Sequence, residues 1–466
     1  MATPKPSPDK RRRLPSISRL LEHPRTAEAL TRLPRTVVVE SFRIELDSLR
    51  TNGMNTSSDE EIVVLALERA AERDRPTLRR AINATGIVLH TGLGRAVLSE
   101  AASEAVNQVA SGHSELEIDA DSGRRGSRQA HVRSLLCELT GAESALVLNN
   151  NAGAVFLAVT ALASGREVVI SRGELVEIGG SFRMPDIIRS SGATLVEVGT
   201  TNKTRLSDFE RAITENTGLL LRCHPSNFKI VGFSEEVPAA DLAALGKRFE
   251  IPVMDDLGSG ALIDSQSIGA GATTTLRAAV ESGCDVITAS GDKLLGGPQC
   301  GIVVGRKDTV DRIASHPLAR ALRVDKLTLA ALEATLRLYR EPERALEAIP
   351  TLRYLSRGVE ELCALASELL EAIGTAPGTH VDLIDSQSQV GGGSLPGENL
   401  PTVCVRIVTV RDRIPADSLS AQLRLNDPPI YGRIRDNALL LDPRTLEREE
   451  IPVIAESVRR ILGESK

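Results

Sequence analysis

The sequence predicts an α/β fold: a mostly parallel, seven-stranded sheet, preceded by a small helical domain and followed by an α+β domain. Seven short apolar runs alternate with segments of helical periodicity between about residues 80 and 340, the pattern of a doubly wound sheet. The seventh run follows the sixth too closely for a helical crossover, so its strand is expected to be antiparallel to its predecessor. The runs are 144–148, 168–170, 194–198, 219–221, 251–254, 285–289 and 301–305.

The chain has 466 residues, too many for a single hydrophobic core, and we expect it to form two or three domains. The basic, proline-rich residues 1–13 are expected to be a disordered tail, and amphipathic stretches over 14–72 predict a helical domain. Residues 73–82 form a linker. The sheet domain then covers 83–340, and the α+β domain covers 341–466.

The α+β domain is predicted from a second alternation of helices and strands. A long helix begins near Leu327 and continues towards residue 370, with interruptions at Pro342 and Pro350. A stretch rich in glycine and proline follows at 375–401, where the pattern predicts no strand before residue 402. Strands are then expected at 402–410 and 438–441, and helices at 416–423 and 449–462.

The composition limits the classes of protein to which this chain can belong. No apolar run approaches the length of a membrane span, and the N-terminus lacks the apolar core of a secretory signal. The six cysteines form no CxxC pair and the seven histidines no metal-ligand spacing, so we expect a cytoplasmic protein without a metal. The net charge is −6, yet residues 1–36 carry nine Lys/Arg against three acids. Such a segment indicates a polyanionic partner or, more commonly, a solvated tail.

Lys293 gives the first indication of chemistry. It stands three residues after Ser290, on the glycine-rich turn that follows the apolar run 285–289. Ligands of open α/β sheets bind at such strand ends, so the hydroxyl and the amine are expected to face one crevice. Enzymes that use pyridoxal phosphate (PLP) have this arrangement, in which the lysine forms a Schiff base and the serine binds the phosphate. The alternative is a surface lysine on a loop.

Asp256 supplies the carboxylate that such a site needs. It follows the apolar run 251–254 and stands 37 residues before Lys293, where it would pair with the ring nitrogen of PLP. The alternative is an ordinary N-cap or turn aspartate, which is the interpretation that we keep for Asp255.

The predicted phosphate cradle comprises Asn151, Ala152 and Gly153. These residues follow the apolar run 144–148 and open a helix-like segment. Small residues at a helix N-terminus let backbone N–H groups approach an anion, and the helix dipole favours its charge. Asparagine-rich turns of this kind are common, so the prediction of a phosphate-binding site here depends on the presence of Lys293 and Asp256.

Four longer motifs occur along the chain. They are Asn-Ala-Thr-Gly at 83–86, Asp-Leu-Gly-Ser-Gly at 256–260, Ser-Gly-Asp-Lys-Leu-Leu-Gly-Gly-Pro-Gln at 290–299 and His-Pro-Leu-Ala-Arg-Ala-Leu-Arg at 316–323. In sequence and order they resemble the bacterial selenocysteine synthase family, the L-seryl-tRNA(Sec) selenium transferases. The resemblance extends from about residue 14 to the end of the chain.

The resemblance implies a fold-type I PLP-dependent transferase, similar to aspartate aminotransferase. The implied reaction converts L-seryl-tRNA(Sec) into L-selenocysteinyl-tRNA(Sec) by β-elimination through an aminoacrylate, followed by addition of selenium from selenophosphate. It further implies that the helical N-terminal domain binds the tRNA and that the enzyme assembles as a ring of dimers, a decamer.

The implied reaction assigns roles to several side chains. Lys293, once released from the cofactor, is a usable base for the Cα proton. Asp292 is placed to help the hydroxyl leave or to tune the lysine, or it is only a turn residue. By resemblance, Arg95, Arg320 and Arg323 bind selenophosphate, since guanidinium groups suit a tetrahedral anion; the alternative is surface ion pairs.

Three further roles are hypotheses. Ser226, after the run 219–221, is expected to contact the phenolic oxygen of PLP, and Arg433 to contact a carbonyl or carboxylate near Cα. The residue that stacks on the PLP ring stays open between the histidines His90, His113 and His131.

Two other functions are compatible with parts of the sequence. A PLP-dependent β-eliminating lyase on a small amino acid or amino sugar acid phosphate would share the lysine motif. The roughly eighty residues before Asn83, basic at the start, favour the tRNA substrate instead. A non-catalytic nucleic-acid-binding scaffold would not need Lys293, Asp256 and Ser290 together.

Overall fold

The computed structural model describes residues 14–51, 58–180, 182–375, 378–395, 397–409 and 414–463. The tail expected at 1–13 lies outside these ranges. The chain forms two compact units, Met1–Arg80 and Ala81–Lys466. Within the described residues, every helix is too short or too polar to span a membrane.

The first unit is a small helical bundle. Its core contains Leu20, Val38, Phe42 and Ile62, all nearly inaccessible to solvent. The last helix begins with a capping box, in which the Ser58 hydroxyl accepts from the Glu61 amide at 3.2 Å, and the Glu61 carboxylate accepts from the Ser58 amide at 2.8 Å. The helices are α1 (Ile17–Leu21), α2 (Pro24–Ala29), α3 (Arg35–Thr51) and α4 (Asp59–Asp74).

The second unit contains the seven-stranded sheet that the sequence predicts, with the order β2-β10-β9-β8-β7-β3-β6. Strand β10 is antiparallel to both of its neighbours, as expected, and the other pairs are parallel. The prediction of a mostly parallel sheet is therefore confirmed. The strands are β2 (Ser144–Leu148), β3 (Glu167–Ser171), β6 (Thr194–Val198), β7 (Thr217–Cys223), β8 (Val253–Gly258), β9 (Val286–Ser290) and β10 (Gly301–Gly305).

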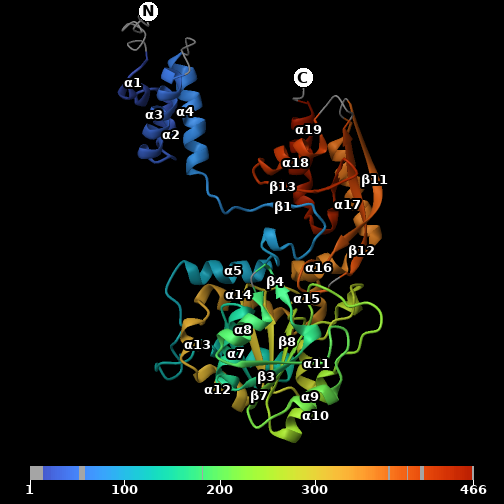
Figure 1. The fold of residues 1–466 in the computed structure, drawn as a ribbon. Coiled ribbons are helices and arrows are strands. Elements are labelled where there is room, and N and C mark those ends of the chain that lie inside the picture. The colour runs from blue at the N-terminus through green and yellow to red at the C-terminus, as the bar shows by residue number, and fades with distance from the viewer. Residues whose placement is uncertain are drawn as a thin grey trace, which may run out of the picture. The chain divides into compact units, whose positions relative to one another are not determined.

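Helices cover both faces of this sheet (Figure 1), and alternate strand residues enter two separate cores. Val147 packs with α6 and α14, whereas Leu146 and Leu148 pack with α7 and α12. Both faces of the sheet are covered, which is why most of its strands are apolar runs, whereas the edge strand β6 is half-exposed and carries Glu197. The helices of this region are α5 (Glu100–Ala110), α6 (Ala130–Thr140), α7 (Asn151–Ala163), α8 (Met184–Ser190), α9 (Leu206–Ala212), α10 (Ala239–Phe249), α11 (Leu276–Glu281), α12 (Lys307–Ser315), α13 (Leu318–Ala321) and α14 (Lys326–Leu338).

The C-terminal part is built on a four-stranded antiparallel sheet in the order β11-β12-β15-β14. Its strands are β11 (Thr379–Gln389), β12 (Asn399–Thr409), β14 (Arg433–Arg435) and β15 (Ala438–Leu441). Its helices are α15 (Pro342–Ala348), α16 (Pro350–Ser356), α17 (Val359–Ile373), α18 (Ala416–Arg424) and α19 (Ile451–Gly463). The short strand β13 (Ile430–Tyr431) pairs in parallel with β1 (Ile82–Asn83), which joins this part to the start of the unit.

The sequence analysis was wrong about 375–401, where it predicted no strand before residue 402. Strand β11 occupies 379–389 and pairs with β12 over its whole length, and the two form the longest strand pair in Figure 1. Most side chains of β11 are half-buried or exposed, so the strand lacks the apolar run that marks the central sheet. As an edge strand, it depends on pairing with β12, which the local sequence does not reveal.

Candidate active site

A cavity of about 260 Å³ lies where β2, β7, β8 and β9 end and the following loops begin. This is the edge of the sheet at which open α/β folds bind ligands. Most of the predicted site residues line it, but Gly153, Arg320 and Arg323 do not. Those that it brings together are Arg95, Asn151, Ala152, Ser226, Asp256, Ser290, Asp292 and Lys293.

Lys293 is buried, with 5% of its surface exposed. Its Nζ donates a hydrogen bond to the carbonyl of Gly393 at 2.8 Å, and burial lowers the pKa of the amine although Asp256 opposes this. A lowered pKa favours the neutral amine, which is the nucleophilic and basic form. The backbone of residue 393 has a φ of +87°, a left-handed conformation that favours glycine, and a Cβ there would lie 2.8 Å from Nζ.

Asp256, at the end of β8, is held by side chains from three other elements. Oδ1 accepts from Asn151 Nδ2 at 2.8 Å and from Thr288 Oγ1 at 2.9 Å, and Cys223 Sγ lies 3.7 Å from Oδ2. Burial raises the pKa of this carboxyl, and these hydrogen bonds oppose the rise. They stabilise the ionised form that pairing with a ring nitrogen needs. The sequence analysis did not identify Thr288 or Cys223.

The start of α7 is organised differently from the predicted cradle. Asn150, which the sequence analysis did not select, is the N-cap: its Oδ1 accepts from the Gly153 amide at 2.8 Å. The side chain of Asn151 is directed to Asp256 instead of to the helix end. Asn150, Asn151 and Ala152 line the cavity, so the helix N-terminus still faces it.

Two buried polar atoms of cavity-lining residues, Ser226 Oγ and Asn151 Oδ1, have no hydrogen-bond partner among the described residues. Buried polar atoms are nearly always paired, so these two atoms indicate a polar ligand. Together with Lys293, Asp256 and Ser290, they fit PLP, which carries an aldehyde, a phenolic oxygen, a ring nitrogen and a phosphate.

The three predicted anion-binding arginines are not gathered in one place. Arg95 lines the cavity, and its Nη1 lies 2.8 Å from Asp292 Oδ2. Arg320 and Arg323 are exposed, on α13 and just after it. Arg323 Nη1 lies 3.9 Å from Glu117 Oε1. Their role in binding selenophosphate stays a prediction.

No histidine among the three ring-stacking candidates lines the cavity. His90, His113 and His131 are all absent from its wall, whereas His224, directly after β7, is part of it. Burial lowers the pKa of His224, which favours its neutral form. The sequence analysis did not select His224, although its position directly after a buried strand and two residues before Ser226 could have indicated it.

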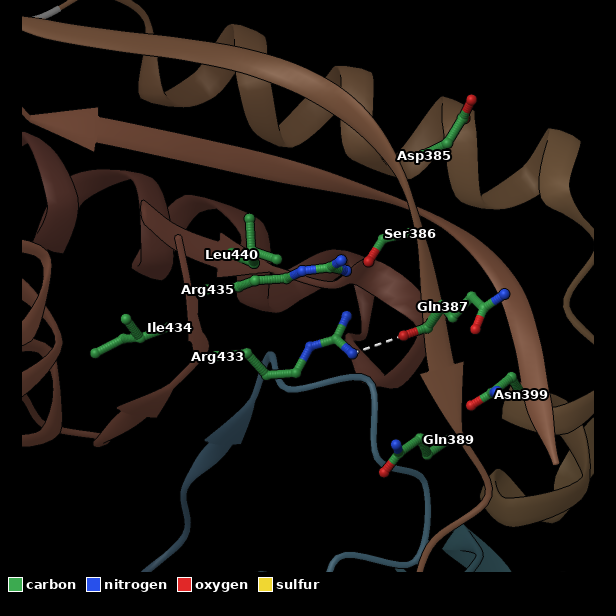
Figure 2. A pocket seen from close by; sticks show the side chains of 9 residues that line it. All are labelled: Asp385, Ser386, Gln387, Gln389, Asn399, Arg433, Ile434, Arg435 and Leu440. Atoms are coloured by element: carbon green, nitrogen blue, oxygen red, sulfur yellow. Dashed lines mark hydrogen bonds between the residues drawn. The ribbon is translucent and has the colours of Figure 1, made fainter. Parts of the chain in front are cut away.

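Arg433 lies in a different cavity, of about 650 Å³, on the C-terminal sheet (Figure 2). Its Nη1 donates to the carbonyl of Gln387 at 2.6 Å, and its Nη2 donates to the buried carboxylate of Asp442 at 2.9 Å. The hypothesis that Arg433 contacts a carbonyl or carboxylate near Cα is therefore not supported.

Comparison with known proteins gives matches over nearly the whole chain. Residues 81–447 match the family model described as L-seryl-tRNA selenium transferase, and residues 11–50 match the one described as selenocysteine synthase N terminal. The L-seryl-tRNA(Sec) selenium transferase of Moorella thermoacetica is 51% identical over 94% of this chain and 95% of its own length. That of Geobacter sulfurreducens is 46% identical over 96% of this chain and 98% of its own.

Among solved structures, D-glucosaminate-6-phosphate ammonia-lyase has a similar fold, with a TM-score of 0.57 and 23% sequence identity. The similarity covers 83% of this chain and 97% of the lyase. Together with the family match, it confirms the predicted fold-type I architecture.

Proposed function

Because the chain belongs to the L-seryl-tRNA(Sec) selenium transferase family, we propose that it converts L-seryl-tRNA(Sec) into L-selenocysteinyl-tRNA(Sec), with PLP as cofactor and selenophosphate as selenium donor. The observation that carries the proposal is the cavity in which the buried amine of Lys293 and the buried carboxylate of Asp256 meet. The alternative, a lyase on a small molecule, is set aside, because the family match includes the N-terminal segment 11–50.

The residues of the cavity supply each contact that the cofactor needs. Lys293 would hold it covalently, Asp256 would face the ring nitrogen, and Ser226 would donate to the phenolic oxygen. The phosphate would lie between Ser290 and the start of α7, where Asn151 and Ala152 line the cavity. When bound, PLP supplies an electron sink for the bonds at the substrate's Cα.

Lys293 is the residue best placed to move the Cα proton of the seryl group. Burial lowers the pKa of its amine, which favours the neutral form, and only a neutral amine accepts a proton. Asp292 is adjacent to Lys293 and pairs with Arg95 at 2.8 Å. We propose that this pair orients the seryl hydroxyl as it leaves Cβ.

The selenium donor is a tetrahedral anion, for which arginine is a suitable partner. We propose that Arg95 binds it inside the cavity and that Arg320, on α13, and Arg323, just after this helix, add positive charge. The last two side chains are exposed in a single chain. We also propose that the enzyme assembles as a ring of dimers, which is what the resemblance to the family implies.

The first unit is proposed to bind the tRNA. The nine Lys/Arg of residues 1–36 give it the charge that phosphate groups attract. A cytoplasmic location is proposed as well: all six cysteines lie in the described residues and are free, which is typical of a reducing compartment.

Purified protein loaded with PLP should form selenocysteinyl-tRNA(Sec) from seryl-tRNA(Sec) only when selenophosphate is added. Free serine should give no product. Lys293→Ala should abolish product formation and leave tRNA affinity within about twofold, because the amine is buried in the cavity. Product formation by the Lys293→Ala variant, or equal turnover of free serine, would contradict the proposed function.

A further inference from the structure

The motif Asn-Ala-Thr-Gly at 83–86 forms a turn that its own side chains hold in place. Asn83 Oδ1 accepts from the amide of Thr85 at 3.1 Å and from its hydroxyl at 2.6 Å. Asn83 Nδ2 donates to the carbonyl of Ile87 at 3.0 Å. Such a turn fixes the direction in which the chain leaves β1. None of the four residues is among those that line the cavity around Lys293, so an effect of the motif on the chemistry must be indirect.

After this turn the chain runs in parallel beside the end of β11. The amide of Gln389 donates to the carbonyl of Gly86 at 3.0 Å, and the amide of Leu89 donates to the carbonyl of Val390 at 2.8 Å. A Cβ at residue 391 would lie 2.6 Å from the carbonyl oxygen of Leu89, and the φ of +113° at this residue favours glycine. The two stretches of chain are therefore packed backbone against backbone.

Both stretches continue to the reacting groups. The first ends at Arg95, whose Nη1 lies 2.8 Å from Asp292 Oδ2. The second ends at Gly393, whose carbonyl accepts a hydrogen bond from Lys293 Nζ at 2.8 Å. A displacement of the two stretches would therefore move a partner of each reacting side chain. We refer to them as the paired segments, 86–95 and 389–393.

Asp442, directly after β15, is a fully buried carboxylate that accepts four hydrogen bonds. Its Oδ2 accepts from Ser388 Oγ at 2.8 Å and from Arg433 Nη2 at 2.9 Å. Its Oδ1 accepts from Thr402 Oγ1 at 2.9 Å and from the amide of Arg444 at 3.1 Å. Donors from three strands and one loop converge on this side chain, so its position is fixed from several directions.

The same residue contacts both paired segments where they begin. Its amide donates to the carbonyl of Ala84 at 2.9 Å. A Cβ built on Gly86 would overlap the carboxylate of Asp442, so this carboxylate packs directly against the backbone of the first segment. Ser388, which donates to the carboxylate, immediately precedes the second segment.

We propose that Asp442 is a positioning residue: through Gly86 and Ser388, it fixes the paired segments and thereby the partners of the two reacting side chains. Asp442 is not among the residues that line the cavity, so it acts only through these segments. The inference rests on the proposed function, because it concerns the surroundings of Lys293 in that reaction.

Two substitutions separate this role from a merely structural one. Ser388→Ala and Thr402→Val each remove one hydroxyl donor from the same carboxylate, and both residues are buried. Ser388 lies on β11, which continues into the second paired segment, whereas Thr402 lies on β12. Both variants lose a similar hydrogen bond, but only Ser388→Ala releases a segment that reaches Lys293.

The first measurement is the rate at which PLP reacts with the full-length apoenzyme, followed by visible absorption over a range of pH. A carbonyl that accepts from an ammonium stabilises its charged form, so displacement of the Gly393 carbonyl should lower the pKa of the Lys293 amine. The midpoint pH should therefore fall in Ser388→Ala and stay at the wild-type value in Thr402→Val.

The other groups that act on this amine are unchanged in both variants, and Arg95 belongs to the segment that Gly86 still holds against Asp442. These groups are Asp256, Arg95, Asp292 and Cys223.

The second measurement is turnover of the PLP-loaded enzyme with seryl-tRNA(Sec) and selenophosphate. We expect kcat of Ser388→Ala to fall roughly 10- to 100-fold, because small displacements of reacting groups have effects of this size, with KM within about twofold. Thr402→Val should change neither by more than about twofold. Asp442→Asn, which turns an N–H group towards Arg433 or Arg444, should lower kcat at least as far as Ser388→Ala.

An unchanged midpoint pH and kcat in Ser388→Ala would overturn the inference, and so would wild-type kcat in Asp442→Asn. Equal changes in Thr402→Val would overturn it in favour of general destabilisation. If Asp442→Asn does not fold, the comparison of Ser388→Ala with Thr402→Val decides. If the wild type forms no selenocysteinyl-tRNA(Sec), the proposed function fails, whereas the midpoint pH of the apoenzyme still tests the role of Asp442, so the two failures are distinguishable.

Discussion

Thr288→Val removes one hydrogen bond to the carboxylate that is proposed to face the cofactor. Thr288 is fully buried on β9, and its Oγ1 donates to Asp256 Oδ1 at 2.9 Å. Valine has nearly the same shape, so the substitution removes the donor and adds no cavity. Asn151 Nδ2 continues to donate to the same oxygen at 2.8 Å.

The expected effect is a loss of affinity for PLP. A hydrogen bond to a charged group contributes about 1.5–3 kcal/mol, which corresponds to roughly 10- to 150-fold in a dissociation constant. We expect the lower part of this range, because Asn151 still stabilises the ionised carboxylate. The pKa of Asp256, already raised by burial, should rise further, so the loss should grow at lower pH.

Titration of the apoenzyme with PLP, followed by visible absorption, measures this affinity. Thr335→Val is the matched control, since Thr335 is equally buried but donates to the carbonyl of Ala331 within α14 at 2.8 Å. Equal PLP affinity of Thr288→Val and the wild type would refute the reasoning. An equal loss in Thr335→Val would show that the effect is general destabilisation.

Two further predictions concern the buried carboxyl of Glu174 and the first unit. Burial raises the pKa of Glu174 from 4.5 to about 8, so the folded protein binds more protons than the unfolded chain between these values. The free energy of unfolding should therefore fall with rising pH across this window, by at most about 1.4 kcal/mol per pH unit. In denaturant titrations at several pH values, this fall should be smaller for Glu174→Gln than for the wild type. An equal dependence of the unfolding free energy on pH in both proteins would contradict this prediction. Deletion of residues 1–80 should weaken tRNA binding roughly tenfold or more and leave PLP affinity unchanged; undiminished tRNA affinity would contradict the role of the first unit.

The central sheet could be predicted because its strands are buried on both faces. Strand β10 is buried at every residue and carries no polar side chain, and the run 301–305 was predicted with the bounds that this strand has in the structure. Its antiparallel direction followed from the short connection to β9. Strand β11, in contrast, could not be predicted, because only Val381, Leu383 and Ile384 of its eleven residues are apolar and because its pairing with β12 is not visible in the local sequence.

The site could be predicted where a functional group stands next to a strand end. Lys293 and Asp256 meet this condition, and they line one cavity. Thr288 does not, because a single hydroxyl inside an apolar run is also typical of an ordinary buried strand. The direction of the Asn151 side chain could not be predicted either, because it depends on where β8 places Asp256.

The hydrogen bond between Lys293 and Gly393 has a consequence for the order in which the site is completed during synthesis. The two residues are separated by 100 positions, and ribosomes add about 5–20 residues per second. For roughly 5–20 s after Lys293 is added, Gly393, whose carbonyl accepts the hydrogen bond from the Lys293 amine, has not yet been synthesised. A nascent chain that has already formed the central sheet therefore carries an amine without this acceptor, and the site is complete only after β11 and the turn behind it have been made.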